Sequence, residues 1–345
     1  MARPIQDVVD NYVASVNRVD KQAMQRLVES YSRVYADIKR QAEMLILDVS
    51  ASGKPMTGAA IMRLDRYKNL MADMRRELGR YGVVVDDVVA VSTSAAATAG
   101  ARSMEQLILN MFPPEAQASI AATLGRMPAE AVKALVGALQ AESPLASVTL
   151  ARYGETAAQQ MSKALISGMV QGIGARKTAA QILASVDPIL GVPLTKALTI
   201  ARTEANRAFR QASRASMRTN PHIVKGWTWY ANINGTPEPC LACLAMHGSE
   251  HTMNETLNDH PNGRCVMMPI TPTFRELGFD VDEAVDPVPT GKQVFDGLPE
   301  ARQRAIMGGT RYDAYKAGKF DFADMAMTRH SDEWGDTIAI APISG

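Results

Sequence analysis

The three cysteines of this 345-residue chain all lie in one segment, from Cys240 to Cys265. Cys240 and Cys243 have the two-residue spacing of a metal knuckle, and His260 lies shortly before Cys265. Three thiolates and one imidazole are sufficient donors for a tetrahedral zinc ion. The sequence therefore predicts a zinc site made of Cys240, Cys243, His260 and Cys265. A closed set of four donors leaves no position for water, so the predicted role of the metal is structural.

Other interpretations of these residues stay open. The cysteines could be reduced thiols buried as small apolar side chains, with His260 on the surface. His247 or His251 could replace His260, although neither lies beside the second predicted strand. Cys265 could also be a nucleophile activated by His260, but a metal site accounts for both residues better.

Four arginines recur along one predicted helix at steps of three and four residues, which places them in a single stripe: Arg207, Arg210, Arg214 and Arg218. Alanines recur on the opposite side and would let a neighbouring helix approach closely. The stripe is a candidate contact for phosphate or for an acidic protein surface. A solvent-facing stripe is the plain alternative, and the absence of interleaved aromatic residues weakens the nucleic-acid interpretation.

Helical periodicity dominates the residues that precede this stripe, so the predicted fold class is mainly α. Gly and Pro interrupt the periodicity, and Pro188 to Pro193 is predicted to form a turn. The predicted helices are Ile5–Ser50, Ile61–Gly82, Met104–Phe112, Ala116–Leu124, Ala129–Gln140, Leu145–Val170, Lys177–Val186 and Leu194–Met217.

Two predicted strands flank the cysteines. Residues 227–233 alternate in polarity, Asn234-Gly235 favours a tight turn, and Val266–Ile270 forms the second strand. The chain is therefore predicted to be a multi-helix N-terminal region followed by a small α+β domain with a zinc-stapled loop. The expected division is 1–193 for the helical docking region, 194–275 for the α+β domain and 276–345 for a C-terminal appendage. One helix, Pro299–Ala317, and an apolar tail at 337–341 are expected in that appendage.

Composition limits the classes of protein that fit. The 37 Lys+Arg residues nearly balance the 36 Asp+Glu residues, so nucleic-acid binding would need a local basic patch. The best apolar run, Val83 to Val91, is broken by Asp86 and Asp87, so no membrane helix is expected. The N-terminal residues lack a secretion signal, so we expect synthesis in a reducing compartment and no disulfides.

Motifs typical of several enzyme classes are incomplete. Gly53-Lys54-Pro55 lacks the preceding glycine of a phosphate loop, and Gly172-Ile173-Gly174 follows a helical pattern instead of a strand. The segment His247 to His251 does not have the zincin order. Ser92-Thr93-Ser94 with Gln140-Ala141-Glu142 faintly matches an ADP-ribosyltransferase pattern, but in stretches predicted to be helical. The sequence therefore predicts no enzyme.

Several motifs occur together in a fixed order. They are Ala201-Arg202-Thr203-Glu204-Ala205-Asn206-Arg207-Ala208, Lys225-Gly226-Trp227-Thr228-Trp229, Cys240-x-x-Cys243, Gly248 and His260-Pro261-Asn262-x-Arg264-Cys265. In this order they resemble the phage Mu F-like head morphogenesis family, the minor head proteins of tailed phages, over roughly residues 160 to 270. Family members often carry Cys where this chain has Gly263, so Cys265 takes the donor role here.

The resemblance implies a structural minor head (capsid) protein without catalytic activity. Such a protein is made in the cytoplasm of the bacterial host and resides in the virion, inside the capsid near the portal vertex. The implied partners are the portal protein, with the major capsid or scaffolding protein and packaged DNA as further candidates, and no membrane. Genome delivery is a second role that the resemblance leaves open. The alternative function is a DNA-binding or DNA-guiding module that uses the arginine stripe.

Overall fold

The computed structural model describes residues 5–52, 56–142, 146–170, 175–233, 238–278, 280 and 288–342. The chain forms two compact units, each made of segments that are distant in sequence. The first unit contains Met1–Val19, Thr93–Leu139 and Ala205–Gly345, and the second contains Asp20–Ser92 and Gln140–Glu204. The predicted division at 193/194 and 275/276 stays a prediction.

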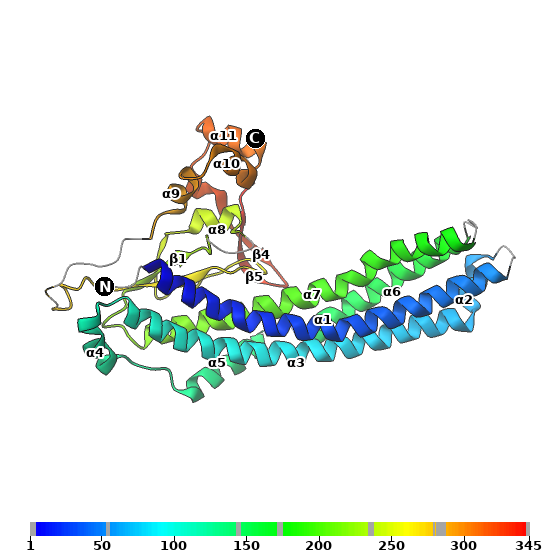
Figure 1. Ribbon diagram of the computed structural model, residues 1–345, viewed down its shortest axis with the longest axis horizontal. Helices are drawn as coiled ribbons and strands as arrows, with labels where there is room; N and C mark the ends of the chain where they lie inside the picture. Colours follow the sequence, from blue (N-terminus) through cyan, green and yellow to red (C-terminus); the bar gives the residue numbers. More distant parts are fainter. Residues whose placement is uncertain are drawn as a thin grey trace. The chain divides into compact units, whose positions relative to one another are not determined.

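Long helices make up most of the chain, as the periodicity predicts (Figure 1). They are α1 (Ile5–Ala51), α2 (Gly58–Arg63), α3 (Asp65–Asn110), α4 (Pro114–Thr123), α5 (Ala129–Glu142), α6 (Ala146–Val170) and α7 (Ala175–Arg218). Helices α1, α3 and α7 each contribute residues to both units. The multi-helix N-terminal region is therefore confirmed.

The predicted turn between Pro188 and Pro193 is wrong, because both prolines lie inside the continuous helix α7. Each proline removes one helical hydrogen bond and crowds the preceding turn. Contacts with α1 compensate within the second unit. Tyr35 Oη donates to Asp187 Oδ1 at 2.7 Å, Lys39 Nζ lies 3.0 Å from the same oxygen, and Tyr31 Oη donates to the carbonyl of Leu190. Tertiary contacts therefore hold this proline-containing stretch helical.

Within its described residues, the second unit is built from helices alone. Its core is apolar and shielded from solvent. The fully buried side chains include Leu27, Ile38, Leu45, Ile46, Met74, Val85 and Leu165. Buried tyrosines extend this core, since the rings of Tyr31 and Tyr81 lie 4.8 Å apart. Aliphatic burial of this kind is the main favourable contribution to the stability of a helical bundle.

Helix α3 is long and apolar enough to cross a membrane, judged by length and composition. The sequence predicts no such helix, because charged residues interrupt its apolar run. The core helix of a water-soluble protein meets the same criterion. In this protein 39% of the 18-residue window that meets the criterion is buried.

The first unit contains a three-stranded antiparallel sheet in the order β2-β1-β3. The strands are β1 (Gly226–Tyr230), β2 (Glu250–Thr252) and β3 (Val266–Ile270). Strand β3 has the predicted bounds, β1 ends three residues earlier than predicted, and the predicted turn at Asn234-Gly235 lies outside the described residues. Strand β2 was missed because three residues are too short to show alternation. Trp227 and Trp229 of β1 are buried in the core of this unit.

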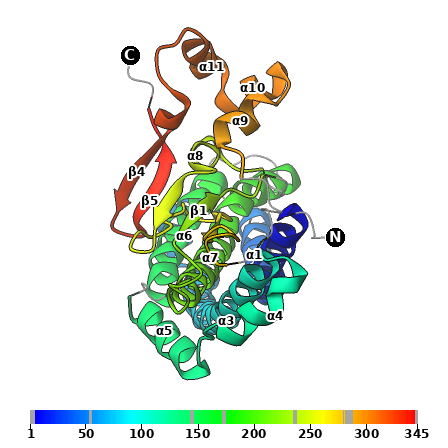
Figure 2. The same ribbon diagram turned by 90° about the vertical axis from the view of Figure 1, so that its left-hand side faces the viewer.

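The C-terminal part of the first unit is more ordered than the sequence predicts. It contains α9 (Gly291–Asp296), α10 (Glu300–Met307), α11 (Gly309–Lys316), a 3₁₀ helix at Phe322–Met325 and the hairpin β4 (Ala326–Ser331) and β5 (Gly335–Ile340) (Figure 2). The single helix predicted at 299–317 is therefore wrong. Gly308, with a φ of 80°, divides it into α10 and α11. A further short helix, α8 (Leu241–Met246), lies between β1 and β2. Buried aromatic residues of this part, among them Phe295 and Phe322, contact Leu241 and Leu244 of α8.

A close helix crossing in the first unit generates a prediction. Gly100 of α3 lies against α7, and a Cβ atom there would be 2.3 Å from the carbonyl oxygen of Phe209. Gly100→Ala should therefore lower the free energy of unfolding by about 1–3 kcal/mol. Gly137→Ala in α5 is the matched control, because no atom lies within 4 Å of its added Cβ. Helix propensity should make this control about 0.5–1 kcal/mol more stable. Urea unfolding measures both, and equal effects would contradict the crossing.

Candidate metal centre

The knuckle is formed by the start of helix α8. Cys240 is the N-cap residue, and its Sγ accepts a hydrogen bond from the backbone N–H of Cys243 at 3.4 Å. This cap folds the two side chains toward each other, with 3.5 Å between their sulfurs. The Cys-x-x-Cys spacing therefore produces a sulfur pair through ordinary helix capping.

The loop that follows β2 brings His260 to this sulfur pair. A tight turn from His260 to Gly263 has Asn262 at a φ of 64° and a 2.8 Å hydrogen bond from Gly263 N to His260 O. His260 Nε2 lies 3.4 Å from Cys240 Sγ and 3.3 Å from Cys243 Sγ. Its Nδ1 lies 2.8 Å from the carbonyl oxygen of Pro261. In the neutral imidazole, which is the form that binds a metal, a proton on Nδ1 directed at that carbonyl leaves the Nε2 lone pair for the knuckle.

These three donors could hold a metal ion. Four donors at about 2.0–2.3 Å from a central zinc ion lie about 3.3–3.8 Å from one another in tetrahedral geometry. The three distances within the triangle Cys240, Cys243 and His260 fall in this range, at 3.5, 3.4 and 3.3 Å. We call these three residues the donor triangle.

Cys265, the fourth predicted ligand, belongs to a different group. It is buried, and its sulfur lies with Cys243 and Asp259 in a set whose ligand atoms are within 4.8 Å of one another. The two groups overlap at Cys243. The structure therefore assembles three of the four predicted ligands and brings Cys265 to only one of them.

Hydrogen bonding sets the protonation of the donor triangle. The hydrogen bond with Cys243 lowers the pKa of Cys240 to about 4, and His260 adds to this effect. The same interaction raises the pKa of Cys243, which keeps the shared proton. The hydrogen bond to Cys240 raises the pKa of His260 to about 9, and burial raises the pKa of Cys265. Cys240 is therefore the sulfur most readily available as a thiolate, which is the form that binds metals.

Asp259 lies at the centre of the loop and was not identified from the sequence. Its side chain is fully buried. Oδ1 accepts from the backbone N–H of His260 at 2.8 Å, and Oδ2 accepts from that of Cys265 at 3.0 Å. Arg210 Nη1 lies 3.5 Å from Oδ2. The only available signal was an acidic residue directly before the His260-Pro261 pair, and no spacing rule singles it out.

The arginine stripe contacts this loop. Arg210 is buried, and its Nη1 lies within 3.4–3.5 Å of the carbonyl oxygens of Gly263 and Cys265. Arg214 donates to the carbonyl oxygens of Met253 at 3.2 Å and Asn254 at 2.9 Å.

Arg218 at the end of the stripe donates to Met253 O at 3.2 Å, while Arg207 is partly exposed. Three of the four arginines thus bind the chain's own loop, and Arg210 offers no solvent-facing surface. A contact of the whole stripe with a partner or with nucleic acid stays a prediction. The alanines opposite the stripe are buried as expected, including Ala205, Ala208 and Ala212.

The two alternative histidines lie outside the donor triangle. His247 is buried, its Nδ1 accepts from the backbone N–H of Ala231 at 3.0 Å, and burial lowers its pKa to about 4. His251 stacks on Trp227 with 4.2 Å between ring centroids. Among the described residues, His260 is thus the histidine that reaches the knuckle.

Ser249, His251 and Glu255 are arranged like a catalytic triad. Ser249 Oγ lies 2.9 Å from His251 Nε2, and His251 Nδ1 lies 3.2 Å from Glu255 Oε1. However, the Ser249 hydroxyl donates to the carbonyl of Met246 at 2.7 Å, so it presents a lone pair to the imidazole instead of a proton. A nucleophilic serine needs the reverse polarity. Glu255 also caps the backbone N–H of Thr252 at 2.7 Å, so this cluster fixes a turn.

The other enzyme patterns gain no support from the fold. Residues 92–94 lie inside α3 and residues 140–142 lie at the end of α5, so the ADP-ribosyltransferase-like residues are helical. Gly53-Lys54-Pro55 and Gly172-Ile173-Gly174 lie outside the described residues. Cys265 and His260 are not brought together as a nucleophile and base, since His260 contacts Cys240 and Cys243.

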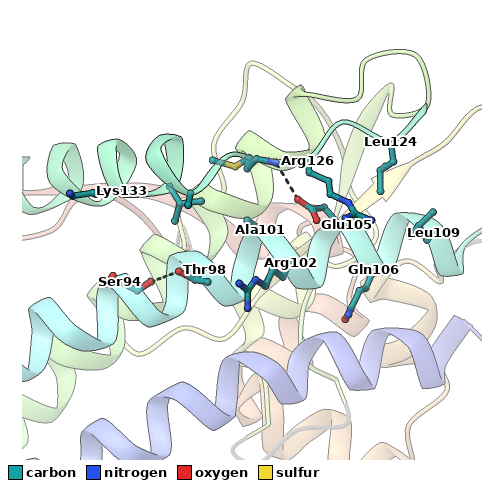
Figure 3. Close-up of a pocket in the computed structure, with 13 residues that line it drawn as sticks. Ser94, Thr98, Ala101, Arg102, Glu105, Gln106, Leu109, Leu124, Arg126 and Lys133 are labelled. Atoms are coloured by element: carbon teal, nitrogen blue, oxygen red, sulfur yellow. Dashed lines mark hydrogen bonds between the residues drawn. The ribbon is translucent and has the colours of Figure 1, made fainter. Parts of the chain in front are cut away.

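The first unit also has a half-open groove of about 750 Å³ between α3 and the segment that leads into α5 (Figure 3). Leu109, Leu124, Met127 and Val132 contribute apolar surface, and Arg102, Arg126 and Lys133 contribute positive charge. Glu105 is its one carboxylate, and this side chain accepts from the backbone N–H of Met127 at 3.2 Å. The groove therefore combines apolar surface with an excess of cations.

Fold and site together define a mainly helical protein whose small strand-containing part carries a buried cluster of Cys, His and Asp. Residues 159–268 match the family model described as Phage Mu protein F like protein, which confirms the resemblance for this segment. The matched segment runs from α6 to β3 and includes the donor triangle, Asp259 and Cys265. This is a family of structural phage head proteins. No curated protein and no solved structure matches the chain.

The buried contact between Arg210 and Asp259 generates a prediction. Arg210→Ala should lower the free energy of unfolding by about 3–5 kcal/mol, because it leaves a buried carboxylate without its positive partner. Arg218→Ala is the matched control from the same stripe. Its exposed side chain should contribute less than about 1 kcal/mol. Chemical denaturation of both variants measures the difference in the free energy of unfolding. A similarly small decrease in both variants would show that the contact between Arg210 and Asp259 contributes little to stability.

Proposed function

We propose that this chain is a structural minor head protein of a tailed bacteriophage that acts in head morphogenesis inside the capsid, near the portal vertex. The observation that carries the proposal is the family match over residues 159–268, the segment that contains the buried cluster. The use of charged groups within the chain also supports an architectural role, because Arg210 and Asp259 hold backbone groups of one loop.

We propose zinc as the metal of the cluster and a structural role for it. Thiolate and imidazole donors favour zinc over the hard cations magnesium and calcium. Bound to Cys240, Cys243 and His260, zinc would supply a cross-link between the start of α8 and the turn at 260–263. The strand-containing part is small, and segments of this size commonly need such a cross-link for stability.

We propose the portal protein as the partner of the helical region, with the groove between α3 and α5 as the docking surface. Its three cations, Arg102, Arg126 and Lys133, are complementary to an acidic segment, and its apolar side chains can bury the nonpolar face of that segment. The major capsid or scaffolding protein is a second candidate partner in the head.

The alternative function, a DNA-binding or DNA-guiding module built on the arginine stripe, has less support. Arg210 is buried, and Arg214 and Arg218 already donate to carbonyl oxygens of the loop at 253–254. Phosphate contacts require guanidinium groups that can reach solvent. Packaged DNA and genome delivery are therefore secondary proposals.

Metal removal gives one test. Full-length protein purified without chelator should contain about one zinc per chain, and Cys240→Ser should contain far less. The ion binds the folded state. With free zinc at a hundredfold excess over its Kd, the free energy of unfolding should therefore be about 3 kcal/mol higher than after chelation. His251→Asn, which changes a histidine outside the donor triangle, is the control and should retain zinc. Metal analysis and thermal unfolding decide this, and a zinc-free protein indifferent to chelation would refute the site.

The head role is tested with purified phage heads. Quantitative mass spectrometry should find this chain in heads at a copy number far below that of the major capsid protein. The triple variant Arg102→Glu, Arg126→Glu and Lys133→Glu should reduce its incorporation at least tenfold, because it reverses the charge of the groove.

The matched control is Arg63→Glu, Lys319→Glu and Arg329→Glu, which changes the net charge equally at exposed positions outside the groove. It should be incorporated normally. Equal losses in both variants would refute the groove as the docking surface, and absence of the chain from heads would refute the head role itself.

A further inference from the structure

We infer that Asp259, and not Cys265, completes the metal site as the fourth donor. This inference rests on the proposed metal site and concerns which side chains form it. The donor triangle leaves one tetrahedral position to be filled, and two buried side chains lie close enough to compete for it.

Interatomic distances distinguish the two candidates. Asp259 Oδ1 lies 3.6 Å from Cys243 Sγ and 3.7 Å from His260 Nε2. With the triangle itself, five of the six distances among the four donor atoms then fall between 3.3 and 3.7 Å. These are the donor separations expected around a tetrahedral zinc ion, about 3.3–3.8 Å.

Cys265 does not match this pattern. Its sulfur lies within 4.8 Å of Cys243 and Asp259, whereas Asp259 Oδ1 also lies 3.7 Å from His260 Nε2. Its backbone N–H donates to Asp259 Oδ2, so Cys265 also helps to orient the carboxylate. The structure thus gives Cys265 a positioning role behind Asp259.

The surroundings of Asp259 hold its carboxylate in place while leaving donor capacity. Oδ1 accepts one backbone hydrogen bond, from His260, and a carboxylate oxygen has two lone pairs. Gly263 makes room for the group, because a Cβ atom at this position would lie 2.0 Å from the Asp259 carboxylate. A backbone that accommodates the carboxylate so closely fixes its direction toward Cys243.

The charges of the buried cluster also favour this donor set. Two thiolates and one carboxylate contribute three negative charges, which balance a divalent zinc ion together with the guanidinium of Arg210. If Cys265 bound as a third thiolate, the Asp259 carboxylate would still lie in the cluster. Four negative charges would then face three positive ones, and one uncompensated negative charge in a buried site is unfavourable.

Cobalt substitution of the full-length protein tests the assignment. In Co(II)-loaded protein, the intensity of the sulfur-to-cobalt charge-transfer band counts the bound thiolates. Wild type should show two. Cys265→Ser should keep the same intensity and bind cobalt within about threefold of wild type. Asp259→Asn should bind at least tenfold more weakly, and Asp259→Cys should raise the intensity by half because it adds a third sulfur at the ion.

Circular dichroism establishes that each variant is folded, and Cys265→Ser decides the matter even if the variants at 259 do not fold. A fall in intensity by one third in Cys265→Ser would overturn the inference, because it would identify Cys265 as a ligand. An unchanged intensity in folded Asp259→Cys would also overturn it. If wild type binds neither cobalt nor zinc, the proposed metal site itself is refuted. If wild type binds cobalt through three sulfurs, the metal site stands and only the assignment of Asp259 is refuted.

Discussion

The buried pair of Arg210 and Asp259 is the interaction on which the small strand-containing part depends. Removing two charges from water is unfavourable, and their attraction offsets this only when their remaining hydrogen-bonding groups are satisfied. Both groups have hydrogen-bond partners here. The carboxylate accepts from two backbone N–H groups, and the guanidinium lies against two carbonyl oxygens of the same loop. The pair therefore connects α7 to the turn at 260–263 and sets the orientation of that turn.

This arrangement positions the side chains of the donor triangle through the protein itself. His260 directly follows Asp259, so the backbone that binds the carboxylate also directs the imidazole toward Cys240 and Cys243. Helix capping at Cys240 assembles the sulfur pair independently. Two separate local structures thus meet at the donor triangle, which reduces the ordering that an ion must impose when it binds. The arginine stripe has a similar role, because Arg210, Arg214 and Arg218 attach α7 to the loop at 253–265.

Much of this could be predicted from the sequence because the signals are local. Long amphipathic periodicity predicted the helices, and the Cys-x-x-Cys spacing predicted the sulfur pair. Signals that depend on tertiary contacts were missed or misread. The prolines in α7 suggest a turn unless the contacts of Tyr31 and Tyr35 are known, and the arginine stripe appears solvent-facing unless the loop at 253–265 is placed. Asp259 belongs to no motif, since its importance follows from the close contact that Gly263 allows between the backbone and its carboxylate.

The first unit draws on the beginning, the middle and the end of the chain. A hydrogen bond between the hydroxyls of Tyr12 and Ser213 joins positions 201 residues apart. This contact can form only after both residues have left the ribosome, so it follows synthesis of at least the first 213 residues. A chain that ends before Ala205 would lack every α7 residue of this core.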